Sequence, residues 1–290
     1  MPLLPNEPRI ADEAVQTGLT EQYLLPALQA LAALFVGLRY ALDVELRQAR
    51  PVKQGKPYPL GQCLEISQAL LQRLSQLDPA TLKPEAARGF QALTQFARQG
   101  GLVRQVWGDL RGEYFQNALL VGGLYVDVAN DTVDPRKPPV EILPFAEARL
   151  GPISDFHHFS RVAARYWQAR LYPNHLVPAL APYFPLMSVS SEGFIQLQSA
   201  SNYMIALTQA GAFYPAEAVL EGALMDAQLF GVLHGRLSTL PIMLAAQPSV
   251  GQAAALTACK AYRDQGIAGN SQHRDKAVKA VLQVNAALVS

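Results

Sequence analysis

The chain has 290 residues, of which half are hydrophobic and only 16% are charged, and its formal net charge is +1 at pH 7. It contains no run of Lys and Arg, so we expect neither nucleic acid nor an anionic membrane surface as a partner. A surface with few charges is typical of proteins that bind a protein partner or a small ligand, or that form homo-oligomers. The length allows one large domain or two small ones, with a sizeable core.

Cysteine content and the N-terminal sequence bear on the compartment. Cys63 and Cys259 are too few for a disulfide framework or an ordinary zinc site, which favours a reducing, cytoplasmic location. The first residues lack the basic start and apolar run of a signal peptide. The most apolar stretch, Leu24–Leu38, is shorter than the roughly 20 residues that a transmembrane helix needs, so we expect no membrane span.

The first half of the chain alternates helical patterns with loops rich in proline and glycine. Residues 1–19 are expected to form an extended or partly ordered arm. The next helix, to about Ala49, is apolar in its first half and charged in its second, which predicts burial at one end and solvent at the other. A proline-rich loop, 51–61, follows it. Two further helices are predicted at about 62–77 and 84–98.

A β-hairpin is predicted between about residues 115 and 131, where the helical pattern stops. Two β-type runs flank Gly122-Gly123, and the second one continues to Val128. Alternation along that strand places Tyr125 and Asp127 on one face and Val126 and Val128 on the other. The segment Val140–Leu143 is a candidate third strand.

From Gly151 onward the pattern is helical to the end of the chain. The fold class predicted is therefore mainly α with a small antiparallel β element. Residues 20–150 form an α+β half, and residues 151–290 form an α-helical half that either packs on it or continues it as one domain. No internal repeat, dinucleotide-binding glycine motif, P-loop or zinc-protease motif is present, and no cofactor is predicted.

Cys63 is the first candidate for chemistry. It lies two residues after Gly61, where the proline-rich loop becomes a helix. A thiol at a helix N-terminus is favoured as a thiolate by the helix dipole, and the free N–H groups there can bind an oxyanion. The alternative is that Cys63, like Cys259, packs in the core as a small hydrophobic residue.

The order of loop, Gly-x-Cys, helix and β-hairpin ending in Asp resembles the core of the transglutaminase-like and papain-like cysteine enzymes. The resemblance covers about residues 58–135, and the matching residues are Asn117-Ala118, Gly122-Gly123 and Tyr125-Val126-Asp127. It implies a catalytic cysteine at the start of a helix, with a histidine and an Asp on neighbouring strands. Asn117, with Gln116 beside it, stands where the histidine would be, and neither amide can accept a proton from a thiol.

Three aspartates near the hairpin, Asp127, Asp131 and Asp134, form a second candidate. Clustered carboxylates suit a hard cation such as Ca²⁺ or Mg²⁺. Asn130-Asp131 and Asp134-Pro135 are also ordinary turn formers, however, and the spacing matches no ion-binding loop. We therefore predict no metal site.

A third candidate is the segment that begins at His157 and His158. Adjacent helical residues point about 100° apart, so these two would not chelate one metal together. Arg161, Arg165 and Trp167 follow on the same helix and are candidate ligand-binding residues for an anion or an aromatic molecule. The alternative is a helix–helix interface with arginine stems packed along it.

Two hypotheses follow from these observations. In the first, the chain is an α-rich binding protein built on a catalytically incomplete cysteine-enzyme-like core. In the second, it is a thiol hydrolase or acyl transferase whose nucleophile is Cys63. The second would use His157 or His158 as the base, Asp127 to orient it, and Gln62 or Asn117 at the oxyanion. A histidine within hydrogen-bond reach of the Cys63 sulfur would distinguish them.

Overall fold

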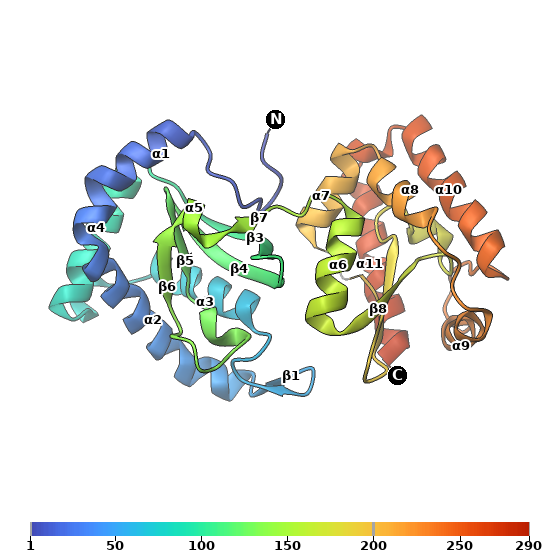
Figure 1. Cartoon of the computed structure of the whole chain (residues 1–290), viewed down its shortest axis with the longest axis horizontal. Coiled ribbons are helices and arrows are strands. Elements are labelled where there is room, and N and C mark those ends of the chain that lie inside the picture. The colour runs from blue at the N-terminus through green and yellow to red at the C-terminus, as the bar shows by residue number, and fades with distance from the viewer. Residues whose placement is uncertain (1, 199–200, 290) are drawn as a thin grey trace. The chain divides into compact units, whose positions relative to one another are not determined.

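A computed structural model describes residues 2–198 and 201–289. The chain forms two compact units, one made of residues 6–152 and one that begins at Ile153 and includes Pro2–Pro5 (Figure 1). With 54% of residues in helices and 15% in strands, the fold is mixed α and β rather than purely helical.

The first unit contains a five-stranded antiparallel sheet. Its order is β6-β5-β4-β3-β7, so the two longest strands, β3 and β4, lie inside it. The predicted hairpin is the β4–β5 pair, in which Val121 faces Leu124 across the Gly122-Gly123 turn. Gly122 has φ +59°, a conformation that glycine adopts without steric cost. The strands are Val103–Leu110 (β3), Tyr114–Val121 (β4), Leu124–Asp127 (β5), Glu141–Pro144 (β6) and Leu150–Gly151 (β7).

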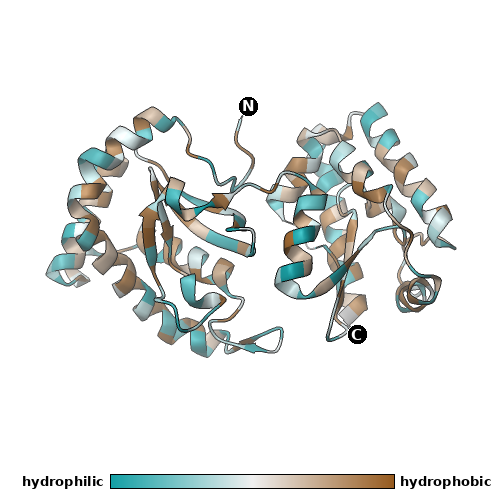
Figure 2. Cartoon of the chain, viewed as in Figure 1, coloured by the Kyte–Doolittle hydropathy of each residue, from teal (hydrophilic) through white to brown (hydrophobic). Residues whose placement is uncertain are grey.

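Three helices pack together with one face of this sheet: α2 (Leu28–Ala49), α3 (Cys63–Ser75) and α4 (Pro84–Arg98). Leucines and phenylalanines of the helices meet the apolar residues that alternate along β4 and β5, and hydrophobic residues mark these strands in Figure 2. The result is one continuous core. Its fully buried members include Leu31, Leu34, Phe35, Ile66, Leu70, Phe96, Leu119 and Val128.

The N-terminal segment is helical from Glu13, whereas the sequence predicted an arm through residue 19. Helix α1 (Glu13–Leu19) runs on through a π-helical turn (Thr20–Leu24) and a 3-10 turn (Leu25–Ala27) into α2. Gln16 anchors it, since its amide donates to the carbonyl of Gly100 and accepts from the N–H of Leu102. By length and composition the whole run, Glu13–Ala49, could cross a membrane, but a core helix of a soluble protein passes the same test.

Short elements complete the first unit. The proline-rich loop holds a small hairpin of β1 (Val52–Lys53) and β2 (Lys56–Pro57). A short helix, α5 (Phe145–Ala148), separates β6 from β7, and 3-10 turns lie at Pro79–Thr81 and Asn130–Thr132.

The second unit is not all helical, which corrects the prediction for residues 151–290. It contains a three-stranded antiparallel sheet of β8 (Ala169–Pro173), β9 (Leu186–Ser190) and β10 (Ile195–Leu197), in the order β10-β9-β8. These runs are short and apolar, and prolines or glycines bound them, so helix and strand cannot be told apart by periodicity. The amide of Asn285 donates to and accepts from the backbone of Leu197, where another strand would otherwise pair.

Helices make up most of the rest of the second unit. Cys259 is fully buried in one of them, as its apolar surroundings predicted. Two 3-10 turns lie at Pro178–Leu180 and Ile267–Gly269. The helices are α6 (Phe156–Trp167), α7 (Asn202–Ala210), α8 (Tyr214–Leu220), α9 (Ala227–Leu237), α10 (Pro248–Asp264) and α11 (Ser271–Val289).

The close approach of α2 and α4 yields a prediction. A Cβ added at Gly89 would lie 2.2 Å from the carbonyl oxygen of Ala30, so Gly89→Ala must push the helices apart. We expect a loss of about 1–3 kcal/mol in the free energy of unfolding, measured in urea. Gly37→Ala on the open side of α2 is the control and should stabilise by about 0.5–1 kcal/mol, because nothing lies within 4 Å of its Cβ. Equal effects of the two variants would contradict this account.

Candidate functional site

Cys63 is the first residue of α3 and is buried against the sheet. The side-chain amide of Asn117 on β4 donates to the thiol, and its Nδ2 lies 3.5 Å from the Cys63 Sγ. Burial raises the pKa of the Cys63 thiol, and the amide donor of Asn117 offsets this only in part. The thiol is therefore neutral at physiological pH and lies in the core.

Two further hydrogen bonds hold Asn117 in place. Its Oδ1 accepts a hydrogen bond of 3.2 Å from Gln105 Nε2, and its backbone carbonyl accepts one of 3.2 Å from the hydroxyl of Ser67 on α3. An amide cannot take up the proton of a thiol at neutral pH. The group at the sulfur of Cys63 is thus a hydrogen-bond donor rather than a base.

Asp127 lies on the opposite face of the sheet from Cys63. Val126 faces Leu119 in the register, and both belong to the core beneath the helices. Because strand side chains alternate, Asp127 points to the other face, together with Tyr125. The sheet, here strands β4 and β5, therefore separates the carboxylate of Asp127 from the thiol of Cys63.

Three donors surround the carboxylate of Asp127. Its Oδ2 accepts from Gln116 Nε2 at 2.7 Å and from the Tyr125 hydroxyl at 2.8 Å, and its Oδ1 accepts from the backbone N–H of Ala129 at 2.8 Å. Burial raises the pKa of Asp127 to about 6, although each of these bonds favours the ionised form. The carboxylate is engaged in fixing the end of β5.

Gln62 precedes Cys63 and is fully buried. Its Nε2 donates to the carbonyl of Arg50 at 3.0 Å, whereas its Oε1 is buried without a hydrogen-bond partner. The donor that an oxyanion would need is therefore already used to hold the loop before α3.

No histidine belongs to residues 6–152, the unit that contains Cys63; all five lie in the second unit. His157 is exposed near the start of α6. The ring of His158 accepts from the backbone N–H of Ser154 at 3.2 Å, and the backbone N–H of His158 donates to the side chain of Asp155, the N-cap of the helix. These contacts suit a role in helix capping.

The other residues predicted for ligand binding lie farther along α6. Arg161 and Arg165 are exposed, and the ring of Trp167 packs edge-on against Phe159, with centroids 5.8 Å apart. Trp167 thus takes part in aromatic packing within the second unit.

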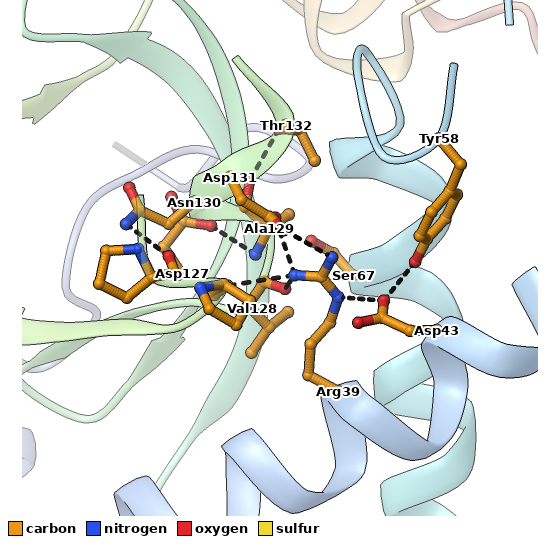
Figure 3. Close-up of polar contacts among 12 residues, drawn as sticks. Arg39, Asp43, Tyr58, Ser67, Asp127, Val128, Ala129, Asn130, Asp131 and Thr132 are labelled. Atoms are coloured by element: carbon orange, nitrogen blue, oxygen red, sulfur yellow. Dashed lines mark hydrogen bonds and ion pairs between the residues drawn. The ribbon is translucent and has the colours of Figure 1, made fainter. Parts of the chain in front are cut away.

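Arg39 is the centre of a polar network in the first unit, although the sequence placed it in the solvent-exposed half of its helix. It is instead fully buried. Its guanidinium forms a bidentate pair with Asp131 at 2.9 and 3.0 Å and a second ion pair with Asp43 at 2.8 Å. It also donates to the backbone carbonyls of Val128 and Pro139 (Figure 3).

This network ties the proline-rich loop and the segment after β5 to α2. Tyr58 in the proline-rich loop donates to Asp43, and Asp131 follows β5 directly. The loop is further joined to the segment after β5 by a hydrogen bond from Gly61 N–H to the Thr132 carbonyl. Burial alone would lower the pKa of Arg39, but the ion pairs with Asp131 and Asp43 raise it, so the side chain stays charged.

The predicted acidic set is divided among separate partners. Asp127 binds Gln116 and Tyr125, Asp131 pairs with Arg39, and Asp134 pairs with Arg136 at the surface. Among the residues that the structure describes, no group of three or more His, Cys, Asp or Glu side chains is placed to hold a metal ion. Asp127 and Asp134 each accept from the backbone N–H two residues further on, as turn-forming aspartates do, whereas Asp131 is held by its ion pair with Arg39.

Two open grooves lie on the described surface, and neither contains Cys63 or Asp127. The first is lined by apolar residues of α3, α4 and β3, among them Leu74, Phe90 and Leu93. The second lies between α9 and the start of α10, beside Phe230 and His234.

Comparison with known proteins adds no family: no protein family, curated protein or solved structure matches this chain.

The Arg39 network yields a prediction about stability. Arg39→Met leaves Asp131 and Asp43 without their buried partner, so we expect a loss of about 3–5 kcal/mol in the free energy of unfolding, measured in urea. Arg73→Met is the control, because its pair with Glu45 is exposed and should contribute less than about 1 kcal/mol. A loss in Arg39→Met no larger than in the control would refute a central role for the network.

Asp127 yields a prediction about pH. The folded chain holds this proton up to about pH 6, whereas an unfolded aspartate releases it near pH 4. Folding therefore takes up a proton in this window, and the free energy of unfolding should fall, by on the order of 2–3 kcal/mol, as pH rises through it. Asp127→Asn should lack this contribution. Parallel pH profiles of the two proteins in urea unfolding would contradict the assignment.

Proposed function

We propose that this chain is a binding protein without enzyme activity, built on a core that has the loop, cysteine, helix and hairpin of the cysteine enzymes in the same chain order but lacks their base. The observation that supports this most directly is the 3.5 Å contact from Asn117 Nδ2 to the Cys63 Sγ. At the position where a histidine would activate the thiol, the chain has an amide that donates to a buried, neutral sulfur.

The surrounding layout agrees with this proposal. A loop leads into a helix that begins with Cys63, and the helix packs on an antiparallel strand that carries Asn117. The following strand ends in Asp127, the position of the orienting carboxylate in that layout. Here Asp127 accepts from the amide of Gln116 rather than from a ring nitrogen, and it faces away from Cys63 and Asn117, so its carboxylate orients no group at the thiol.

The surface favours a partner without strong charge. The chain is nearly neutral overall, with 24 basic and 23 acidic residues. Large apolar side chains are exposed on both units, including Tyr40 and Val44 in the first and Met243 in the second. Exposed apolar side chains on a weakly charged surface suit a protein partner or a small apolar ligand in the cytoplasm.

The second candidate remains a thiol hydrolase or acyl transferase. It is supported by the position of Cys63 at a helix N-terminus with an amide donor at its sulfur. It needs a base, which the first unit does not contain, so His157 or His158 of the second unit would have to supply it. It also needs the thiol to become accessible.

The two candidates differ in the reactivity of Cys63. We expect iodoacetamide to modify Cys63 slowly in the folded Cys259→Ser protein, because the thiol is buried with a raised pKa. The rate, read by intact mass, should reach half its maximum at a pH above the ordinary thiol value of about 8.5 and should rise sharply in denaturant. Asn117→Ala should speed the reaction without lowering that pH.

A fast reaction in the folded protein with its midpoint at or below pH 7 would overturn the proposal. The double variant His157→Ala/His158→Ala then decides whether those rings supply the base, because its midpoint would move upward. Cys63→Ser is the control that assigns the modified mass to this thiol.

A further inference from the structure

The outer face of α2 carries an apolar stripe that nothing in the first unit covers. The inner face of the helix, with Leu34 and Phe35, is fully buried. On the opposite side Tyr40 and Val44 are 59% and 63% exposed, and a Cβ at Gly37 would have no atom within 4 Å. We call this surface the outer stripe; its members are Gln29, Ala33, Val36, Gly37, Tyr40, Ala41 and Val44.

Large and small residues alternate in the outer stripe around a point between Val36 and Gly37. If a second α2 is laid antiparallel on the first about that point, each large side chain meets a small or slender one. Such knob-and-hole matching is how close helix pairs pack. The facing residues are Ala33 and Tyr40, Val36 and Gly37, and Gln29 and Val44.

Charges at the two ends of the helix agree with this orientation. The stripe itself carries none, since no Asp, Glu, Lys or Arg lies between Gln22 and Leu38. Glu21 is exposed before the N-terminal end, and Arg47 and Arg50 are exposed at the C-terminal end. In an antiparallel pair the basic C-terminal end of one α2 lies toward the end of the other that follows Glu21, whereas a parallel pair places the two basic ends side by side.

We propose that the outer stripe is a self-association surface and that its occupant is the same stripe of a second copy in an antiparallel, two-fold symmetric pair. This inference names the partner of the binding function proposed above and rests on it. A two-fold axis requires a self-complementary patch, which the pairing about residues 36 and 37 provides.

A lipid bilayer fits the stripe less well than a second copy does. Only one side of α2 is apolar and free, because the other side forms the core of the first unit and the Arg39 network. The stripe also contains the amide of Gln29 and the hydroxyl of Tyr40. Insertion would have to remove the helix from its core, whereas pairing of two copies leaves the core intact.

Cross-linking tests the geometry directly. Gly37→Cys lies beside the two-fold axis, so a short bifunctional maleimide should link it to its own counterpart. Gln29→Cys and Val44→Cys should each give no product alone, since like positions lie roughly 22 Å apart along the axis. An equal mixture of these two variants should cross-link. The unaltered protein, whose cysteines are buried, is the control.

Sedimentation tests the association itself. One helix pair is a small interface, so we expect a weak dimer whose fraction rises between about 1 µM and about 1 mM. Val36→Glu/Tyr40→Glu should remain monomeric over that range with unchanged circular dichroism. Met243→Glu, which alters an exposed apolar residue of the second unit, should dimerise as the unaltered protein does.

Several outcomes would overturn the inference. A monomer over the whole range would do so, as would cross-linking of Gln29→Cys or Val44→Cys alone, which indicates a parallel pair. Co-sedimentation with neutral phosphatidylcholine vesicles that Val36→Glu/Tyr40→Glu abolishes would assign the stripe to a membrane instead. None of these changes the alkylation of Cys63, so failure of this inference is distinguishable from failure of the proposed function.

Discussion

The burial of one charge, that of Arg39, constrains most of the first unit. A buried guanidinium is tolerated only when its donors are satisfied, and here two carboxylates and two backbone carbonyls do so. Because Asp131 and Val128 lie at the end of β5, the network fixes the hairpin to α2. Because Asp43 also binds Tyr58, it fixes the loop that leads into α3. The position of Cys63 against Asn117 therefore depends on a contact some distance away, and it would be disturbed by any change that releases Arg39.

In several irregular segments, side-chain amides form hydrogen bonds with backbone groups that a neighbouring strand would pair with in a sheet. Gln16 binds Gly100 and Leu102 through both its donor and its acceptor, and Asn285 does the same for Leu197. A buried backbone group without a partner is costly, so each amide allows the chain to turn or end a sheet within the core. Asn117 and Gln116 belong to this pattern. The amide of Asn117 joins β4 to α3, and the amide of Gln116 joins β4 to the end of β5. In a cysteine hydrolase this part of the strand would instead carry the catalytic base.

The sequence predicted those elements that local signals specify. The glycine pair between two β-type runs located the hairpin, and a proline located the start of α4. It did not predict the burial of Arg39, because the partners of a buried charge come from distant segments and leave no periodic signal. It missed the sheet of the second unit, since runs as short as Ile195–Leu197 fit strand or helix equally well. The alternation of side chains along β5 predicted that Asp127 and Val126 point to opposite faces of the sheet. It could not predict that α3, and with it Cys63, packs on the face of Val126.

Helix α2 has two apolar faces: the inner face packs in the core of the first unit, and the outer stripe is exposed. Its inner residues are those expected of any core helix, and a uniformly apolar helix would be buried on all sides. The outer stripe is not buried, yet it has kept small and apolar residues where a solvated helix face would carry Lys and Glu. A free apolar face of this kind is a liability unless a partner covers it. The Arg39 network on the inner side holds α2 rigidly in the first unit, so the outer stripe is exposed without any change in the fold. Pairing with a second copy would therefore cost little conformational entropy.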